Sequence, residues 1–220
     1  MSTFNEKVDT RNLNERVYFY LQNKIITNQL KPGSRINYQE LIDELGVSKT
    51  PLRDAINRLQ QDGFIEIKPR SGTFVKSPNV KDIIEIFDVR KALEREAIAL
   101  AIDRIPQATI SQLLNRIDQV DLDIKSGEIE SFLQLDRDIH HSIIHYTNNA
   151  RLIQIMDSLQ AHIYWIATML TEKLLERSLL ANAHHRQILN AMMKRDVKLA
   201  QEIMEEHIEV IKEVAASDLT

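Results

Sequence analysis

One carboxylate and three imidazoles in the second half of the sequence have the chemistry and the helical phase of a transition-metal site. Asp136 and His140 lie one helical turn apart on the apolar face of their predicted helix. His185 and His207 fall on the apolar faces of two later helices. A buried carboxylate needs a charged partner or a metal ion, and imidazole and carboxylate ligands together suit divalent transition ions. We therefore predict that these four residues bind one ion, zinc first, with nickel or manganese as alternatives.

The remaining histidines have a different helical phase. All seven histidines lie between His140 and His207, but three of them fall on polar faces and are predicted to be exposed: His141, His145 and His184. His162 is left unassigned. The alternative to a metal site is that each buried histidine is a hydrogen-bonded core residue. That explanation suits any single histidine better than it suits four polar groups that converge in one core.

Arg90 and Glu94 stand one turn apart on an otherwise apolar helical face. A buried arginine needs an anion, and two are open here: the carboxylate of Glu94, or the carboxylate of a small ligand shared with the metal. Three more residues are candidates for the lining of a pocket for such a ligand: Tyr146, Asn149 and Trp165. No second arginine falls on the His207 side, so we expect a small monocarboxylate or hydroxy acid before a dicarboxylate.

Hydrophobic periodicity predicts the elements that position these residues. Six helices follow residue 80, over 81–104, 107–126, 128–147, 149–173, 178–194 and 196–216. Before them we expect helices over 12–28 and 38–45, a third helix from about Pro51 to Asp62, and strands over 64–68 and 73–76. The fold class is mainly α: a winged helix-turn-helix domain over 1–79, with a disordered tail over 1–10 and a linker over 77–79, then an all-α six-helix bundle over 80–220.

Composition separates the same two parts. The 220 residues hold 28 Lys and Arg against 32 Asp and Glu, a net charge of −4. Residues 1–79 carry 12 basic against 9 acidic side chains, whereas residues 80–220 carry 16 against 23. Cysteine is absent, which excludes disulfides and thiolate ligands. With no apolar run of about 20 residues and no signal peptide, we expect a cytoplasmic protein with no membrane segment.

Basic and small polar residues lie where a winged helix-turn-helix meets DNA. The third helix of such a module fits the major groove, and its N-terminal amides can contact phosphates. The predicted DNA-binding residues are Arg35, Ser48, Lys49, Thr50, Arg53, Arg58, Arg70, Ser71 and Gly72. The alternative is a solvated basic face, since a net charge of +3 is weak support by itself. The order of elements together with the position of the charge favours DNA binding.

Four segments of the first part closely resemble the GntR family of bacterial transcription regulators: residues 30–35, 45–55, 59–64 and 69–75. The resemblance implies that Lys49, Thr50 and Arg53 contact an operator and that the wing tip, Arg70 to Gly72, approaches the minor groove. Lys49 stands where the family more often has arginine, and an ammonium lacks the fork that binds guanine with two hydrogen bonds.

The second part resembles the ligand-binding FCD domain of the FadR branch of that family. The resemblance lies in residues 135–140, Asn148-Asn149, residues 185–191 and residues 204–207. It implies a divalent metal held by Asp136, His140, His185 and His207, which helps to bind a small carboxylate effector. Ile139 and Asn148 depart from the usual phenylalanine and glycine. Six helices suggest the VanR-type subgroup.

Together these features predict a bacterial, nucleoid-associated regulator that binds a pseudo-palindromic operator as a homodimer, because symmetric half-sites need a two-fold protein. Its operator affinity would depend on a small carboxylate effector bound near the metal. Two alternatives stay open: a regulator for which the ion itself is the signal, and a metal-dependent hydrolase with Glu94 as general base. We favour a protein that is not an enzyme, since no other general base falls on the apolar faces.

Overall fold

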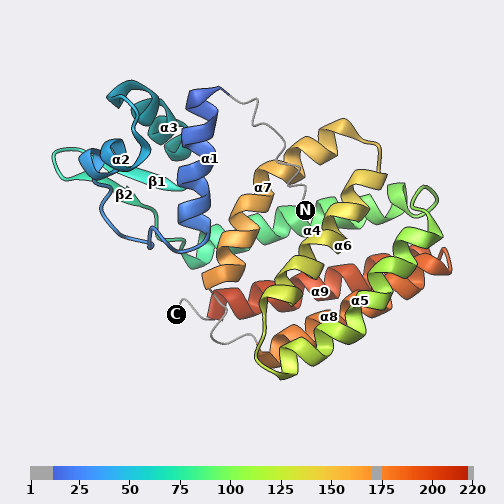
Figure 1. The fold of residues 1–220 in the computed structure, drawn as a ribbon. Helices are drawn as coiled ribbons and strands as arrows, with labels where there is room; N and C mark the ends of the chain where they lie inside the picture. The colour runs from blue at the N-terminus through green and yellow to red at the C-terminus, as the bar shows by residue number, and fades with distance from the viewer. Residues whose placement is uncertain (1–11, 170–174, 218–220) are drawn as a thin grey trace, which may run out of the picture. The chain divides into compact units, whose positions relative to one another are not determined.

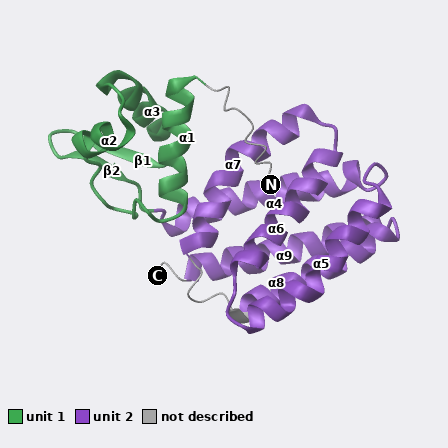
Figure 2. Cartoon of the chain, in the orientation of Figure 1, with its two compact units in different colours: residues 1–77 green, residues 78–220 purple. Residues whose placement is uncertain are grey.

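The computed structural model describes residues 12–169 and 175–217, which form two compact units (Figures 1 and 2). The first unit comprises residues 1–77 and the second residues 78–220. The predicted tail, residues 1–10, lies outside the described residues. No helix within the described ranges is both long and apolar enough to cross a membrane.

The first unit is a winged helix-turn-helix. It contains α1 (Leu13–Ile26), α2 (Tyr38–Leu45), α3 (Lys49–Gln61), β1 (Ile65–Lys68) and β2 (Gly72–Val75). The side chain of Asn12 accepts a hydrogen bond from the Glu15 amide and so begins α1, and Gly46 ends α2 in the left-handed region at φ 62°. Apolar residues from α1 and α3 form the core of the unit, among them Leu21, Leu52 and Leu59.

The two strands form an antiparallel hairpin, in which Ile65 pairs with Val75 and Lys68 pairs with Gly72. Ile65, Thr73 and Val75 share one face of the hairpin and are buried, whereas Lys68 on the other face is exposed, so the first face packs on the helices. The second strand begins at Gly72, one residue earlier than the sequence pattern predicts. Its backbone also forms an isolated bridge to Arg35 through Phe74.

The second unit consists, within the described residues, of six helices: α4 (Val80–Ala101), α5 (Gln107–Lys125), α6 (Glu130–Tyr146), α7 (Ala150–Met169), α8 (Leu175–Met193) and α9 (Val197–Ser217). A capping box of Asn79 and Asp82 begins α4. Helix α9 packs along α4 and α8, and α6 contacts α4, α5, α7 and α8. Apolar side chains from all six helices form one core.

The predicted fold class is confirmed, and each predicted helix of the bundle is present with ends within a few residues of the prediction, except that the last part of the helix predicted over 149–173, residues 170–173, lies outside the described residues. Because α6 lies against four of its neighbours, the polar side chains on its inner face point into the bundle. The fold therefore brings residues that are far apart in the sequence to one place at the centre of the second unit.

Candidate nucleic-acid interface and metal centre

Three exposed cations of the first unit lie on the N-terminal turns of α3 and on the wing. Lys49 and Arg53 are exposed on α3, and Arg70 is exposed in the turn between the strands. Within the described residues none of these three side chains has an ion-pair partner. Ser48, Thr50 and Ser71 are also exposed. Cations that no carboxylate neutralises are free to replace the counterions of a DNA backbone.

The wing turn has a backbone that favours glycine. Gly72 has a φ of +132°, and a Cβ atom there would lie 3.0 Å from Nε of Arg35. Arg70, two residues earlier, has a positive φ of 63°. The side chain of Arg35 therefore lies against the wing, so this predicted DNA-binding residue also covers the turn that presents Arg70.

Arg58 makes contacts within the unit. Its guanidinium lies 3.9 Å from the centre of the Tyr18 ring, and its Nε lies 3.9 Å from Oδ2 of Asp62. The Tyr18 hydroxyl donates a hydrogen bond to the same carboxylate, and burial together with Asp62 raises the pKa of Tyr18. Arg58 thus stabilises the packing of α1 on α3. Its predicted contact with DNA stays a prediction.

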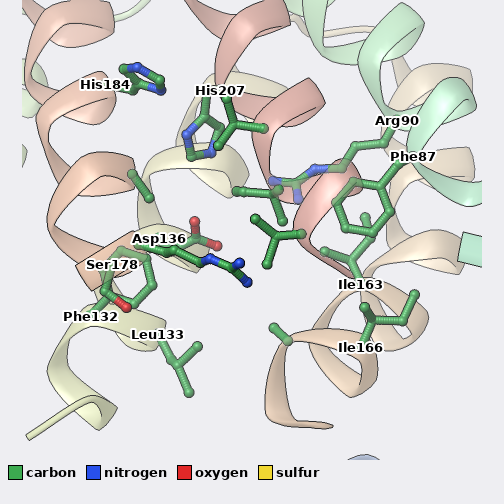
Figure 3. Close-up of a pocket in the computed structure, with 16 residues that line it drawn as sticks. Phe87, Arg90, Phe132, Leu133, Asp136, Ile163, Ile166, Ser178, His184 and His207 are labelled. Atoms are coloured by element: carbon green, nitrogen blue, oxygen red, sulfur yellow. The ribbon is translucent and has the colours of Figure 1, made fainter. Parts of the chain in front are cut away.

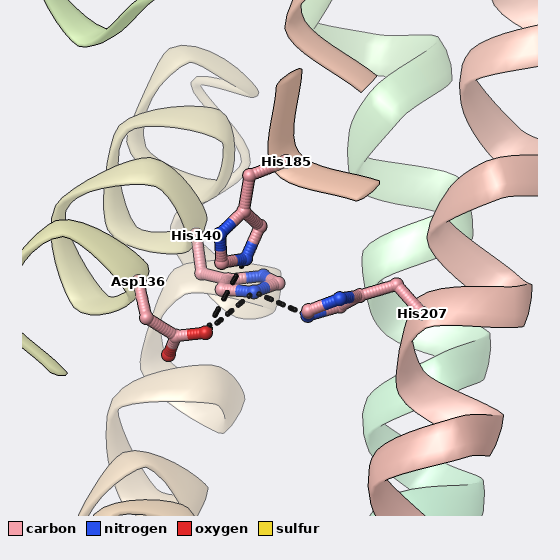
Figure 4. Close-up of side chains that lie close together, drawn as sticks. All are labelled: Asp136, His140, His185 and His207. Atoms are coloured by element: carbon pink, nitrogen blue, oxygen red, sulfur yellow. Dashed lines mark hydrogen bonds and ion pairs between the residues drawn. The ribbon is translucent and has the colours of Figure 1, made fainter. Parts of the chain in front are cut away.

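Asp136, His140, His185 and His207 converge in the second unit (Figure 4). One ligand atom from each residue lies within 4.8 Å of the others. Nε2 of His140 is 3.3 Å from Nε2 of His207 and 3.6 Å from Oδ1 of Asp136, which is 3.3 Å from Nε2 of His185. Two ligands each about 2.1 Å from one ion at a tetrahedral angle lie roughly 3.4 Å apart, so these separations fit a shared ion.

The four side chains are suited to a metal in burial as well as in distance. The three histidines are buried, and 22% of the Asp136 side chain is exposed. Nδ1 of His185 and Nδ1 of His207 have no hydrogen-bond partner within the described residues, while Nε2 of His185 meets the Asp136 carboxylate at 3.3 Å. Buried imidazoles with so few polar partners lose their hydration with little in return, which a metal ligand bond would supply.

Burial and the neighbouring charges lower the pKa values of Asp136, His185 and His207 and raise that of His140. Burial alone would raise the pKa of Asp136, but the histidines around it hold that pKa well below its usual range. Burial and the neighbouring histidines lower the pKa values of His185 and His207. Burial opposes the charged form of His140, yet Glu94 and Asp136 outweigh it and raise the pKa of His140 to about 8.

Glu94 stands behind His140 and beside Arg90. Nδ1 of His140 donates a short hydrogen bond to Oε2 of Glu94, and Nε of Arg90 donates one of 2.7 Å to Oε1. The Glu94 side chain is 0% exposed and that of Arg90 is 3% exposed. Burial alone would raise the pKa of Glu94, but His140 and Arg90 lower it to about 2. Glu94 is thus the anion that Arg90 needs.

A cavity opens beside Asp136 and His207, two of the four candidate ligands (Figure 3). Its volume is about 50 Å³, which is room for a few water molecules. Arg90, Asp136 and His207 line it together with Arg177, Ser178 and His184. The rest of its wall is apolar, from Phe87, Phe132, Leu133, Ile163, Ile166, Ala167, Ala181, Val210, Ile211 and Val214.

Three predicted effector residues are not among those that line this cavity. The hydroxyl of Tyr146 lies 3.4 Å from that of Thr109. The side chain of Asn149 accepts hydrogen bonds from backbone amides in the first turn of α7 and is exposed. Trp165 is buried in the same helix. Helical phase alone did not indicate which side of the bundle core these residues face.

Two expectations about the cavity are wrong. His184 is buried at 7% exposure and lines the cavity, although its helical phase predicted an exposed residue. Arg177 lines the cavity near the start of α8, although no second arginine was expected on this side. Both residues lie on α8, whose two faces are each covered by a neighbouring helix. His141 and His145 are exposed as predicted.

Comparisons with known proteins identify both units. Residues 13–75 match the sequence model "Bacterial regulatory proteins, gntR family", and residues 85–210 match the FCD domain. The chain is 29% identical to the HTH-type transcriptional regulator YdhC of Bacillus subtilis over 141 residues, 64% of this chain and 63% of that protein. The chain therefore spans less than two thirds of the length of that relative.

Solved structures share the fold. Escherichia coli McbR superposes with a TM-score of 0.80 at 21% identity, over 96% of this chain and all of that chain. A metal-free FCD domain of TM0439 superposes with a TM-score of 0.57 at 22% identity, over 65% of this chain and 97% of that one.

A DNA-binding winged helix joined to a helical ligand-binding bundle defines a class of bacterial transcription regulators. This chain belongs to the GntR family of bacterial regulatory proteins, with an FCD domain at its C-terminal side. The prediction that it is not an enzyme is confirmed, because both domains and the relatives are those of transcriptional regulators. Glu94, the predicted general base of the alternative enzyme, has both oxygens in hydrogen bonds.

Proposed function

We propose that this protein is a homodimeric, operator-binding regulator whose DNA affinity is set by a small carboxylate effector beside a divalent transition metal. The observation that carries the proposal is the convergence of Asp136, His140, His185 and His207, of which Asp136 and His207 also line a cavity. Four convergent nitrogen and oxygen ligands are the usual donors for zinc, and nickel or manganese use the same donors.

The DNA half of the proposal rests on the exposed cations of α3 and the wing. In the proposed dimer, one α3 from each protomer enters a major groove and Lys49, Thr50 and Arg53 contact the half-site. Arg70, Ser71 and the backbone at Gly72 approach the minor groove from the wing tip. Ser48 at the start of α3 adds a phosphate contact, and Arg35 holds the wing turn from behind.

The effector half rests on the chemistry of the cavity. Arg90 and Arg177 supply positive charge on its wall, and the open space suits a ligand of only a few non-hydrogen atoms. A bound metal would add a second positive group at Asp136 and His207. A small carboxylate, as a monocarboxylate or hydroxy acid, fits this space. The second arginine also admits a short dicarboxylate.

Ligand and DNA affinity are linked if the effector prefers one conformation of the bundle. An effector that binds one arrangement more tightly shifts the population toward that arrangement. The coupling free energy by which the effector changes operator affinity equals the one by which the operator changes effector affinity. The two domains are joined by a short linker around Ser77 and Pro78, through which such a shift can reach the winged helix.

Metal analysis of freshly purified protein is the first test. We expect about one equivalent of metal in the wild type and a loss of metal in the His140→Ala/His185→Ala variant. The matched control is His141→Ala/His145→Ala, which removes two exposed histidines from the same region of the bundle. Equal metal content in the two variants, or substoichiometric metal in the wild type, contradicts the metal site.

The second test separates the effector from the metal as signal. Operator affinity is measured against free metal and then, at saturating metal, against a panel of small carboxylates. A response to carboxylates at constant metal supports the proposal. A response to metal alone identifies the ion as the signal, and no response to any carboxylate that binds the protein removes the linkage mechanism.

A further inference from the structure

Glu94 accepts hydrogen bonds from two buried side chains, His140 and Arg90. Its carboxylate is fully buried, with Oε2 accepting from Nδ1 of His140 and Oε1 accepting from Nε of Arg90. It is not one of the four residues whose ligand atoms converge. His140 belongs to the group of four, and Arg90 lines the cavity. One carboxylate thus connects the candidate metal site with the wall of the effector cavity.

The contact with Glu94 determines which nitrogen of His140 faces the other ligands. The Glu94 carboxylate accepts from Arg90 with one oxygen and faces Nδ1 of His140 with the other, so the proton of a neutral His140 ring resides on Nδ1. The lone pair is then on Nε2, the atom that lies 3.3 Å from His207 and 3.6 Å from Asp136. A carboxylate behind a histidine is the usual way to fix its tautomer and its ring orientation for a metal.

The same carboxylate determines how Arg90 presents its guanidinium. Because Nε is engaged by Glu94, the planar fork has a fixed direction, and its terminal nitrogens are the donors left for the cavity that Arg90 lines. Arg90 in turn contributes a positive charge that keeps Glu94 ionised and able to hold His140.

We propose that Glu94 is a positioning residue that couples effector and metal: it fixes the metal-facing nitrogen of His140 and the cavity-facing side of Arg90. This inference rests on the metal site of the proposed function and deepens it. An anion that binds Arg90 acts on the metal through Glu94, and by reciprocity the metal changes the affinity for that anion by the same factor.

Glu94→Gln tests the inference, since an amide replaces one of the two oxygens by an NH₂ group and cannot accept at both positions that Oε1 and Oε2 occupy. If its NH₂ group faces His140, the ring must carry its proton on Nε2 and loses that ligand. Zn²⁺ affinity is measured by competition with a chelator. We expect it to fall about 10- to 100-fold in Glu94→Gln and to stay unchanged in Glu85→Gln, a matched control on α4 at an exposed ion pair.

Two further measurements isolate positioning from folding. In the Zn²⁺-loaded wild type, ring ¹⁵N NMR spectra should place the proton of His140 on Nδ1 and the metal on Nε2, and the opposite tautomer overturns the inference. Arg90→Lys keeps the charge but loses the fork. It should weaken Zn²⁺ binding in the wild-type background and have no further effect in Glu94→Gln.

The outcomes distinguish this inference from the proposed function. If wild-type protein takes up no Zn²⁺, the proposed metal site itself fails and the coupling fails with it. If the wild type binds Zn²⁺ and Glu94→Gln binds it equally well, only the coupling role of Glu94 is overturned. The same conclusion follows if Arg90→Lys has an equal effect in both backgrounds.

Discussion

The salt dependence of DNA binding gives a quantitative test of the predicted interface. Arg70 is exposed in the wing turn and has no ion-pair partner within the described residues. If its guanidinium contacts a phosphate, it releases about 0.9 counterions on binding. The proposed dimer carries two copies, so Arg70→Ala should reduce the slope of log affinity against log salt by roughly 1.8.

This change in slope has a measurable size. Over a fourfold increase in salt concentration, the wild type should lose about tenfold more affinity than Arg70→Ala does. Fluorescence anisotropy with one labelled duplex, long enough for both protomers, gives the affinities at several salt concentrations. The sequence of the duplex matters little for this measurement, because the electrostatic part of the binding does not depend on base sequence.

A matched control separates a local contact from a change in net charge. Arg116→Ala removes the same charge from the second unit, where Arg116 pairs with Asp138 at 2.7 Å. We expect the slope of this variant to equal that of the wild type. Equal slopes for Arg70→Ala and the wild type, or an equal reduction in both variants, would refute the assignment of Arg70 to the DNA surface.

Three further predictions follow from contacts in the two units. Arg58→Ala should lower the free energy of unfolding, measured by urea denaturation, by about 1 kcal/mol, because the contact with the Tyr18 ring is lost. If Arg58 serves packing alone, the slope of log DNA affinity against log salt stays unchanged. Gly72→Ala should lower the free energy of unfolding by about 1–3 kcal/mol and weaken DNA binding, because φ +132° disfavours alanine and the new Cβ meets Arg35. The control is Gly127→Ala, at φ +92° with open space around it, which should destabilise the protein without affecting DNA binding. In metal-free protein, Glu94 contributes stability that is present above its ordinary pKa of 4.5 and is lost as the pH falls toward 2, so urea midpoints at several pH values should fall less steeply over this range in Glu94→Gln. A Glu94→Gln variant with the wild-type pH profile would show that the charge of Glu94 is not stabilised in the fold.

The sequence by itself determined where the helices and strands lie and which face of each is buried. Asn12, Asn79 and Gly46 begin or end helices through local hydrogen bonds or backbone freedom, which is why the helix boundaries could be predicted closely. Helical phase was also sufficient to select Asp136 and His140 from their neighbours His141 and His145. These are properties of a single segment, and they do not depend on how the segments pack.

The tertiary structure decided what the buried polar groups meet. Periodicity allowed Glu94 to be a partner of Arg90, but only packing of α6 on α4 shows that the same carboxylate also holds His140. The packing of the helices also decided that His184 and Arg177 line the cavity. A helix in the middle of a bundle has more than one covered face, so its sequence indicates that a residue is inside without indicating which neighbour it contacts.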